Sequence, residues 1–347
     1  MRKWFDEANC ASSNVVYSRV RLARNISGYR FPKSLEKEES QELVSRVMGE
    51  LSGLTDGERG DFTVRELAQI RDLERKALRE RRILNAAVVE KKGAAALLMT
   101  EDEGASVIVN GDDHIRIQVL GAGLCLENLW AEADGLDDRI NEKLEYAFDE
   151  KYGYLTSFLT NVGTGLRACA VLHLPMLSQV KKFQNIVSDM SRVETSIRGL
   201  YGEGAENYGS LYEISNQRTL GQSEEEIIEL VTKAAKQLNN QEQRVRQAGL
   251  DSDSKRLDRL DEIWKSYGVL KYARKITERD ARIFLSLLMA GEADELVSFA
   301  SPCSLYRLIL GSKPANLRLG AQRPLETEEL DCARAAYIRE RLPEING

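Results

Sequence analysis

The clearest pattern along the chain is the alternation of polar and apolar residues in "VVYSRVRLARNI", residues 15–26. Arg19 and Arg21 fall on one face of this predicted strand and Val20 and Leu22 on the other, because successive strand side chains point to opposite faces. Four later segments with short polar separators predict an antiparallel meander: "AAVVEK", "GAAALLMT", "ASVIVNG" and "DHIRIQVL". "LRACAVLHL" is apolar enough for a central strand, and "TSIRGLYG" and "SLYEISNQ" predict two more strands.

Helical spacing of apolar residues marks most of the remaining chain. It predicts helices over residues 34–53, 63–84, 126–150 and 177–192, and further helices over 223–248, 253–274, 277–291, 302–311 and 326–342. Ser223 and Glu226 have the spacing of a capping box at the start of one of them. We therefore expect an α+β fold with two domains, an α+β body over residues 15–245 and an all-helical C-terminal domain over 246–347.

Composition narrows the class of protein. The chain has 347 residues, which favours two domains, and its net charge of -6 argues against a general nucleic-acid binder. No apolar run approaches the ~20 residues of a membrane span, and the first ten residues lack a signal-peptide core, so we expect a cytoplasmic protein that does not contact a membrane. Five scattered cysteines without a CxxC pair and only two histidines give no metal signature.

Arginines near glycine-rich turns carry the candidate chemistry. Five lie in or beside predicted strands: Arg19, Arg21, Arg116, Arg167 and Arg198. The planar guanidinium fork suits phosphate oxygens, so together these residues are candidates for a triphosphate site. There is no GxxxxGK[ST] segment, which excludes a P-loop enzyme. The alternative is that each arginine makes an ordinary surface salt bridge.

Two segments add candidate carboxylates. If "NGDDHIRIQ" is a strand, Asp112, His114 and Arg116 share a face, which would place a carboxylate beside a phosphate-binding arginine. The alternative is an Asn-Gly turn followed by two solvated aspartates, with His114 as a structural hydrogen-bonding residue. "RGLYGEGAENYG" is a glycine-rich loop that would close over a substrate and deliver Glu203, or else a long hairpin connection with solvated glutamates.

Five segments in this order resemble the phosphagen (guanidino) kinases, and specifically the bacterial protein-arginine kinases of the McsB type: "SRVRLARN", "DHIRIQ", "TNVGTGLRA", "RGLYGEG" and "EISNQRTLG". The resemblance implies an antiparallel sheet flanked by helices, with ATP and Mg²⁺ bound across it. The ATP-binding positions that it implies are Tyr17, Ser18, Arg19, Val20, Arg21, Arg82, Arg116, Arg167, Ala168, Cys169, Ala170, Val171, Arg198, Gly199, Leu200, Tyr201, Gly202 and Glu203.

The resemblance also implies that the phosphoryl acceptor is an arginine on another protein, held by two catalytic carboxylates, here Asp112 and Glu203. The chain departs from the family pattern on this acceptor side. The family's NEEDH is "NGDDH", so a glutamate has become Asp112, and its TSCPTN is "TSFLTN", so a cysteine has become Phe158. A position that commonly carries a histidine is Arg82. We therefore expect ATP binding to persist and transfer to arginine to be slowed or altered.

The C-terminal domain of this family carries an RDxxRA motif that reads phosphoarginine. The matching stretch is "LDCARA", in which Asp331 and Arg334 would form the phosphoarginine pocket and Leu330 replaces the leading arginine. The two residues share a helix face, so an ordinary i,i+3 salt bridge is the alternative.

Three functions remain open. The first is an active protein-arginine kinase, whose relatives mark proteins for a Clp-type protease, silence a heat-shock repressor and are activated by an adaptor. The second is a regulatory paralogue that holds ATP or phosphoarginine with little catalysis, which Phe158, Asp112 and Leu330 favour. The third is a kinase of free guanidines, against which the missing N-terminal domain of those enzymes argues. Family likeness suggests a homodimer.

Overall fold

The computed structural model describes residues 2–7, 13–202, 206–321 and 323–346. Within these residues, eight strands form one sheet in the order β11-β12-β10-β1-β7-β6-β5-β4, and the neighbouring strands pair antiparallel. Their bounds are β1 Val15–Arg24, β4 Thr63–Glu66, β5 Ala96–Met99, β6 Ala105–Val109, β7 Ile115–Ala122, β10 Leu166–His173, β11 Thr195–Gly199 and β12 Leu211–Asn216. The predicted antiparallel sheet flanked by helices is confirmed.

One face of the sheet packs against a layer of helices formed by α1 Lys37–Glu50, α4 Leu126–Asn141, α5 Phe183–Arg192 and α6 Glu224–Ala248. Val20 and Leu22 of β1 are fully buried in this core, as the alternation in their segment predicts. Helix α6 begins at the predicted capping box, in which Ser223 accepts from the Glu226 amide and Glu226 accepts from the Ser223 amide.

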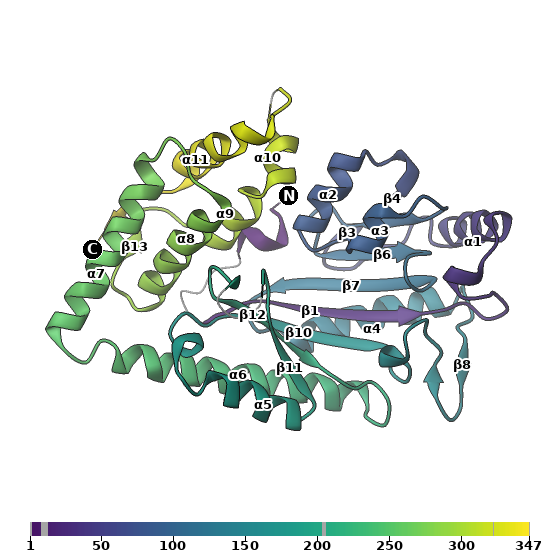
Figure 1. Ribbon diagram of the computed structural model, residues 1–347. Coiled ribbons are helices and arrows are strands. Elements are labelled where there is room, and N and C mark those ends of the chain that lie inside the picture. Colours follow the sequence, from purple (N-terminus) through teal and green to yellow (C-terminus); the bar gives the residue numbers. More distant parts are fainter. Residues whose placement is uncertain (1, 8–12, 203–205, 322, 347) are drawn as a thin grey trace.

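The opposite face of the sheet packs against α2 Asp72–Glu80, α3 Ala86–Glu90 and the C-terminal helices. The latter are α7 Asp253–Tyr272, α8 Glu278–Ala293, α9 Leu305–Gly311, α10 Pro314–Gly320 and α11 Leu330–Arg341, which stand to the left of the sheet in Figure 1. Helix α10 lies against α2. The C-terminal region is helical apart from a pair of two-residue strands, β13 Ser298–Phe299 and β14 Ile345–Asn346.

Three predicted elements differ from the structure. The segment 63–84 is not one helix, because residues 63–66 pair with β5 as an edge strand before α2 begins at Asp72. "AAVVEK" is the short helix α3 rather than a strand, and the Asn85 side chain caps it by accepting from the Val88 amide at 2.9 Å. The helix predicted over 126–150 ends at Asn141 and is followed by the hairpin β8 Phe148–Asp149 and β9 Gly153–Tyr154.

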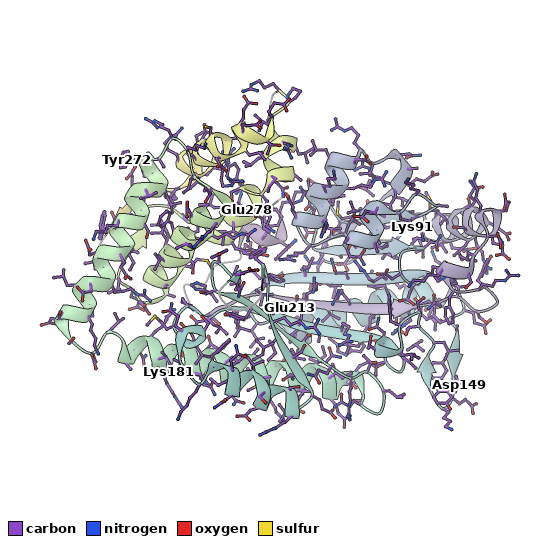
Figure 2. All side chains as sticks on the ribbon, in the orientation of Figure 1. Lys91, Asp149, Lys181, Glu213, Tyr272 and Glu278 are labelled. Carbon is purple, nitrogen blue, oxygen red and sulfur yellow. The ribbon has the colours of Figure 1, made fainter. Side chains whose placement is uncertain are left out.

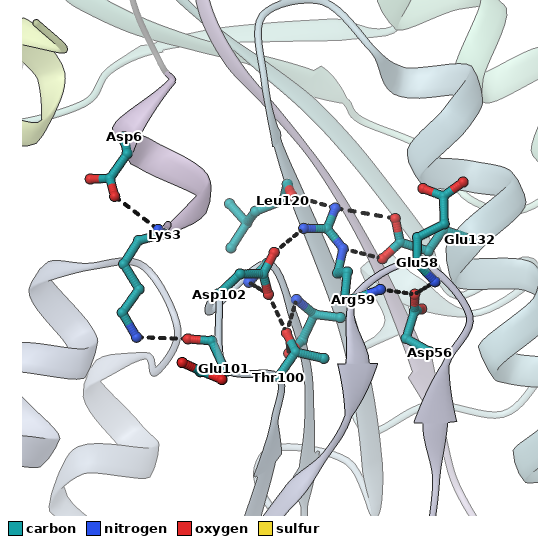
Figure 3. Close-up of polar contacts among 12 residues, drawn as sticks. Lys3, Asp6, Asp56, Glu58, Arg59, Thr100, Glu101, Asp102, Leu120 and Glu132 are labelled. Atoms are coloured by element: carbon teal, nitrogen blue, oxygen red, sulfur yellow. Dashed lines mark hydrogen bonds and ion pairs between the residues drawn. The ribbon is translucent and has the colours of Figure 1, made fainter. Parts of the chain in front are cut away.

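A small hairpin beside the sheet is held by one arginine. Arg59 lies between β2 Thr55–Asp56 and β3 Gly60–Asp61, and its guanidinium donates to Glu132 of α4 at 2.5 Å and to Asp102 at 2.6 Å (Figure 3). It also donates to the backbone carbonyl of Leu120 in β7 at 3.0 Å. Burial opposes the charge of Arg59, but its two carboxylate partners hold the pKa of the guanidinium above its usual range. The hairpin, α4 and β7 are therefore fastened at one point.

The N-terminal residues join the sheet to the C-terminal helices. The Trp4 backbone amide donates to the backbone carbonyl of Asp102, and the Trp4 ring lies against Tyr17 of β1 and Tyr306 of α9. The Ser304 hydroxyl donates to the carbonyl of Phe5 at 2.7 Å. These contacts fix one side of the C-terminal helices on the face of the sheet that carries Arg19 and Arg21.

Candidate active site

A cavity of about 850 Å³ lies between the sheet, α2 and α3, and the C-terminal helix α10. Its lining is strongly basic, with eight cationic side chains against three carboxylates. The cations are Arg19, Arg21, Lys76, Arg79, Arg82, Arg116, Lys313 and Arg318, and the carboxylates are Asp72, Glu80 and Glu90. Since the whole chain carries a net charge of -6, this cavity is a local positive field suited to a polyanion.

Strand register brings the arginines to this cavity. Arg19 pairs with Cys169 of β10 and with Leu120 of β7, and the next position on the same face, Arg21, pairs with Arg167 and Gln118. Arg116 of β7 pairs with Ala23, the following position on that face. Three adjacent strands, β10, β1 and β7, therefore project four guanidinium groups from the same face of the sheet. These are the groups of Arg19, Arg21, Arg116 and Arg167.

The charge at the centre of this group is poorly compensated. Among the described residues, Arg21 has no hydrogen-bond acceptor or ion-pair partner for its side chain. The charge of Arg19, together with burial, lowers the pKa of Arg21 to about 10, and burial together with Arg21 and Arg19 lowers that of Arg116 to about 9. The Nε atoms of Arg19, Arg21, Arg82 and Arg116 are buried without a partner. An anion in the cavity would satisfy them.

Two arginines are held more firmly. Arg19 forms an ion pair of 2.8 Å with Glu213 of β12, which lies centrally where the sheet meets the C-terminal helices (Figure 2). Arg82 follows α2 with a φ of 73°, in the left-handed region that an arginine rarely adopts. The Gln118 side chain donates to the carbonyl of Arg82 at 2.9 Å and so ties this strained position to β7.

A second cavity, of about 230 Å³, adjoins the first. The two share Arg21, Asn85 and Arg116. Beyond this common wall, the smaller cavity is lined by residues of three loops and of β1 and β10, which include Asp112, Asp113, Phe158, Thr160, Asn161 and Arg167. The large basic cavity and the smaller cavity with carboxylates thus share a wall that includes Arg21 and Arg116.

Asp112 lies on the wall of the smaller cavity. Its carboxylate accepts from the Asn85 amide at 2.6 Å and lies 4.0 Å from the Arg116 guanidinium. The preceding residue, Gly111, is closely packed, because a Cβ atom there would lie 3.0 Å from Ile108 and 3.3 Å from Val88. A side chain at position 111 would therefore require Ile108 and Val88 to shift by a few tenths of an ångström.

The loop that carries Phe158 is anchored by a hydrogen bond to a buried carboxylate. Asp113 is 3% exposed and accepts from the Ser157 backbone amide at 2.6 Å and from the Asn25 side chain at 2.8 Å. Phe158 itself is half exposed at the rim of the cavity, with the Lys33 ammonium 5.3 Å from its ring centroid. The position expected to hold a thiol is thus filled by an aromatic ring.

The prediction that Asp112, His114 and Arg116 share a strand face is wrong. Strand β7 begins at Ile115, and Asp112 and His114 lie in the bend before it. His114 is fully buried, where its Nδ1 accepts from the Ile26 amide, which leaves Nε2–H to donate to the Arg30 carbonyl. Burial lowers the pKa of this imidazole, so His114 is the structural hydrogen-bonding residue of the alternative interpretation.

Other predicted site residues lie apart from the large cavity. Arg167 lines the smaller cavity, and its guanidinium donates to the Thr160 carbonyl and to the Asn161 side chain. Arg198 of β11 lines a separate hollow beside α5 with Gly199. Ser18, Val20, Ala168 and Ala170 point into the helix-covered core, whereas Tyr17, Cys169 and Val171 occupy the arginine-bearing face.

Leu200 and Tyr201 pack on the arginine-bearing side, and Tyr201 lines the large cavity. Gly202, with a φ of 155°, approaches Gly199 so closely that a side chain at 199 would meet its carbonyl. The predicted catalytic Glu203 lies outside the described residues.

In the predicted phosphoarginine pocket, Asp331 and Arg334 form an ion pair of 2.6 Å on α11. Arg334 is 2% exposed, and its side chain also donates to the carbonyls of Ser312 and Ile276. Arg334 therefore fastens α11 to the segments before α10 and α8.

Sequence reasoning missed several residues of the site. Glu213 lies within the predicted strand "SLYEISNQ", but its pairing with Arg19 depends on strand order. The role of Asn85 was missed because residues 86–91 were predicted as a strand, so no helix cap was expected at this position. Lys313 precedes the unpredicted helix α10, for which Pro314 at the first helical position was the available signal.

Comparison with known proteins agrees with this geometry. Residues 42–245 match the family described as "ATP:guanido phosphotransferase, C-terminal catalytic domain", and residues 256–347 match the family "Protein-arginine kinase McsB C-terminal domain". The class of protein is therefore the guanido phosphotransferases.

Two relatives narrow the class. The protein-arginine kinase of Desulforamulus reducens is 35% identical over 99% of this chain and 96% of its own, and that of Halalkalibacterium halodurans is 38% identical over 98% and 94%. The chain belongs to the protein-arginine kinase family, phosphotransferases whose acceptor is arginine.

Solved structures show the same fold. The substrate-free duplicated taurocyamine kinase from Schistosoma mansoni aligns with a TM-score of 0.58 at 26% identity, over 66% of this chain and 33% of that one. Lombricine kinase aligns with a TM-score of 0.61 at 23% identity, over 72% of each chain.

Within the described residues, no helix is long and apolar enough to cross a membrane, and no group of three or more metal-ligating side chains gathers.

Proposed function

We propose that the chain transfers the γ-phosphoryl group of ATP to the guanidinium of arginine side chains in proteins. The observation that carries this proposal is the wall of Arg21 and Arg116 shared by the two cavities. Phosphoryl transfer needs donor and acceptor in line, with positive charge around the phosphoryl group between them. A nucleotide in the large cavity and an arginine in the small one would meet at these two guanidinium groups.

The large cavity suits the phosphates of ATP. Arg19, Arg21, Arg82 and Arg116 would contact them, and the unpartnered buried nitrogens of these side chains support this assignment. Mg²⁺ would accompany the nucleotide and neutralise phosphate charge, since this ion is commonly held by phosphates and one or two carboxylates. Arg167 would act at the acceptor end, while Arg198 and residues 199–203 are proposed as ATP-binding positions on family resemblance alone.

The small cavity suits the acceptor. Asp112 would orient the incoming guanidinium and accept its proton as the nitrogen–phosphorus bond forms and the bond to the β-phosphate oxygen breaks. Asn85 fixes the carboxylate by its hydrogen bond of 2.6 Å. Glu203 is proposed as the second carboxylate on family resemblance alone. The electron pair of the broken phosphorus–oxygen bond stays on the β-phosphate oxygen, and ADP then leaves the site.

We further propose that turnover is lower than in relatives with glutamate and cysteine at these positions. Asp112 is one methylene shorter than glutamate, and a misplacement of ~1 Å can cost ~10²-fold in rate. Phe158 offers a ring face in place of a thiol and stands at the cavity rim. The same observations favour a second candidate function, a regulatory paralogue that binds nucleotide or phosphoarginine and transfers little.

The wider role follows from family likeness. We propose division into domains at residues 15–245 and 246–347, a cytoplasmic location and a homodimer. Protein substrates presenting arginine would be marked for a Clp-type protease, a heat-shock repressor would be among them, and an adaptor would activate the enzyme. Asp331 and Arg334 are proposed as a phosphoarginine pocket on family likeness alone, and ligand entry would require Arg334 to give up contacts with Asp331, Ser312 and Ile276.

Mass spectrometry decides between the candidates. The full chain is incubated with ATP, Mg²⁺ and a disordered protein, and phosphoarginine is counted on that protein. We expect phosphoarginine on the protein and little on free arginine. Nucleotide binding without any phosphoarginine would support the regulatory candidate, and equal labelling of free arginine would contradict a protein-directed enzyme.

A further inference from the structure

The large cavity is not built by the sheet alone. It is also lined by Lys313, Pro314, Ala315 and Arg318 of the C-terminal region, which form one of its walls. This wall is fixed by Glu80 at the end of α2, whose carboxylate accepts from the backbone amides of Ala315 and Asn316, both at 2.9 Å.

Lys313 is the notable member of this wall. It is 8% exposed, yet its ammonium has no hydrogen-bond acceptor or ion-pair partner within the described parts of the chain. Burial lowers its pKa. A largely buried ammonium that lines a cavity without a carboxylate or hydrogen-bond acceptor is costly, which makes Lys313 a candidate ligand-binding residue.

The surroundings of Lys313 are also cationic. Its Nζ lies 4.1 Å from the centroid of the Tyr201 ring, and the guanidinium carbons of Arg282 and Arg82 lie 4.2 Å and 5.1 Å from the same centroid. Burial opposes ionisation of Tyr201, but Lys313, Arg82 and Arg282 outweigh it and hold the pKa of the phenol below its usual value. The buried Nε and Nη2 atoms of Arg82 also lack a partner.

The nearby carboxylates do not neutralise this cluster. The Glu80 carboxylate already accepts hydrogen bonds from the backbone amides of Ala315 and Asn316 and from the Asn316 side chain. Glu278 forms an ion pair with Arg282. An anion that enters the large cavity would therefore meet two cations with free capacity at this end, Arg82 from the catalytic side and Lys313 from the C-terminal side.

We propose that Lys313 binds a phosphate group of the nucleotide, so that the C-terminal region supplies part of the ATP site. This inference rests on the proposed placement of ATP in the large cavity. Nucleotide binding then bridges two parts of the chain that lie more than two hundred residues apart in sequence. The Glu80 contact with α10 positions Lys313 for this role.

The test compares three full-length proteins: wild type, Lys313→Met and Lys265→Met. Lys265 is an exposed lysine of the same region, paired with Asp261, so its replacement removes the same charge away from the cavity. Binding of a non-hydrolysable ATP analogue, adenosine and a phosphoarginine peptide is measured by calorimetry, and thermal unfolding is recorded without ligand.

We expect Lys313→Met to bind the ATP analogue about ten-fold or more weakly, because a charge-assisted contact to phosphate is lost. Adenosine should bind as to wild type, and Lys265→Met should bind both ligands normally. The unfolding midpoint of Lys313→Met without ligand should be unchanged or higher, because an unpaired buried cation is removed.

Three outcomes would overturn the inference. The first is an ATP-analogue affinity in Lys313→Met equal to that of wild type. The second is a lowered unfolding midpoint with equal losses for adenosine and the analogue, which would make Lys313 structural. The third is a loss confined to the phosphoarginine peptide, which would assign the cation to that phosphate instead. Failure of the wild-type protein itself to bind the analogue would instead refute the proposed nucleotide site.

Discussion

The two cavities are built from different parts of the molecule. The smaller one is formed entirely by residues 21–167, whereas the larger one needs strands, α2 and α3, and the wall contributed by residues 313–318. The larger one is lined by eight cationic side chains, whereas the smaller one has Asp112 and Phe158 at the positions where the family resemblance implies glutamate and cysteine. The difference teaches that nucleotide affinity should depend on contacts with the C-terminal region, and acceptor chemistry should not.

The largest effect is expected where the cavities meet. Arg21→Met should lower phosphoarginine formation by ~10²-fold or more, because it removes charge stabilisation from both sides of the transfer. The unfolding midpoint should stay the same or rise, since Arg19 and Arg21 repel one another. Arg192→Met, at an exposed ion pair, is the matched control. Unchanged activity in Arg21→Met would show that the shared wall is not the transfer site.

The acceptor side alone is tested by Phe158→Cys combined with Asp112→Glu. We expect turnover on a disordered protein to rise by about ten-fold, because a thiol and a longer carboxylate return to the guanidinium. The affinity for nucleotide should not change. Leu159→Cys is the control, since this neighbour is 90% exposed and does not line the cavity. Wild-type turnover already at ~1–100 s⁻¹ would contradict impairment.

The nucleotide side alone is tested by Glu80→Gln. The carboxylate accepts three hydrogen bonds from Ala315 and Asn316, and weakening them should cost ~1–3 kcal/mol of unfolding free energy in urea titrations. Nucleotide affinity should fall several-fold, and the KM for the protein substrate should not change. Glu328→Gln, at an exposed position, should behave as wild type. An altered KM with intact nucleotide binding would reverse the comparison.

The smallest effect concerns pH. His173 of β10 is fully buried, with its Nε2 2.7 Å from the Ser286 hydroxyl of α8, and burial lowers its pKa to about 3. Between that value and the ~6.5 of an unfolded histidine, the unfolded chain binds more protons. Stability is therefore complete above pH ~6.5 and falls below it, by at most ~1.4 kcal/mol per pH unit from this group.

The measurement is the unfolding midpoint of wild type and His173→Gln at pH 7.5, 5.5 and 4.5. The variant should lose less stability on acidification, although it starts lower because a packed side chain has changed. His114 and the buried carboxylates titrate in both proteins, so the difference in slope isolates His173. Parallel slopes would show that its protonation does not strain the contact between sheet and α8.

Sequence pattern predicted the sheet and the arginine-bearing face because both depend on local alternation, as in residues 15–26. It failed where tertiary pairing decided the structure. Residues 63–66 are a strand because β5 offers an edge, and residues 86–90 are a helix because Asn85 caps them. Lys313 and Glu213 could not be found from spacing, since each joins the site only through the packing of distant elements. The proposed roles of Arg82 and Asp112 rest on the resemblance to a family and could not be derived from local pattern.

The anchoring of the loop by Asp113 has an evolutionary consequence. The Asp113 carboxylate accepts a hydrogen bond from the backbone amide of Ser157 and makes no contact of this kind with the side chain at 158. This anchor of the loop thus does not involve the side chain at 158, which is half exposed. Natural selection, or a protein engineer, can exchange the chemical group at this position at little cost in folding, which makes position 158 a place where new acceptor preferences can arise.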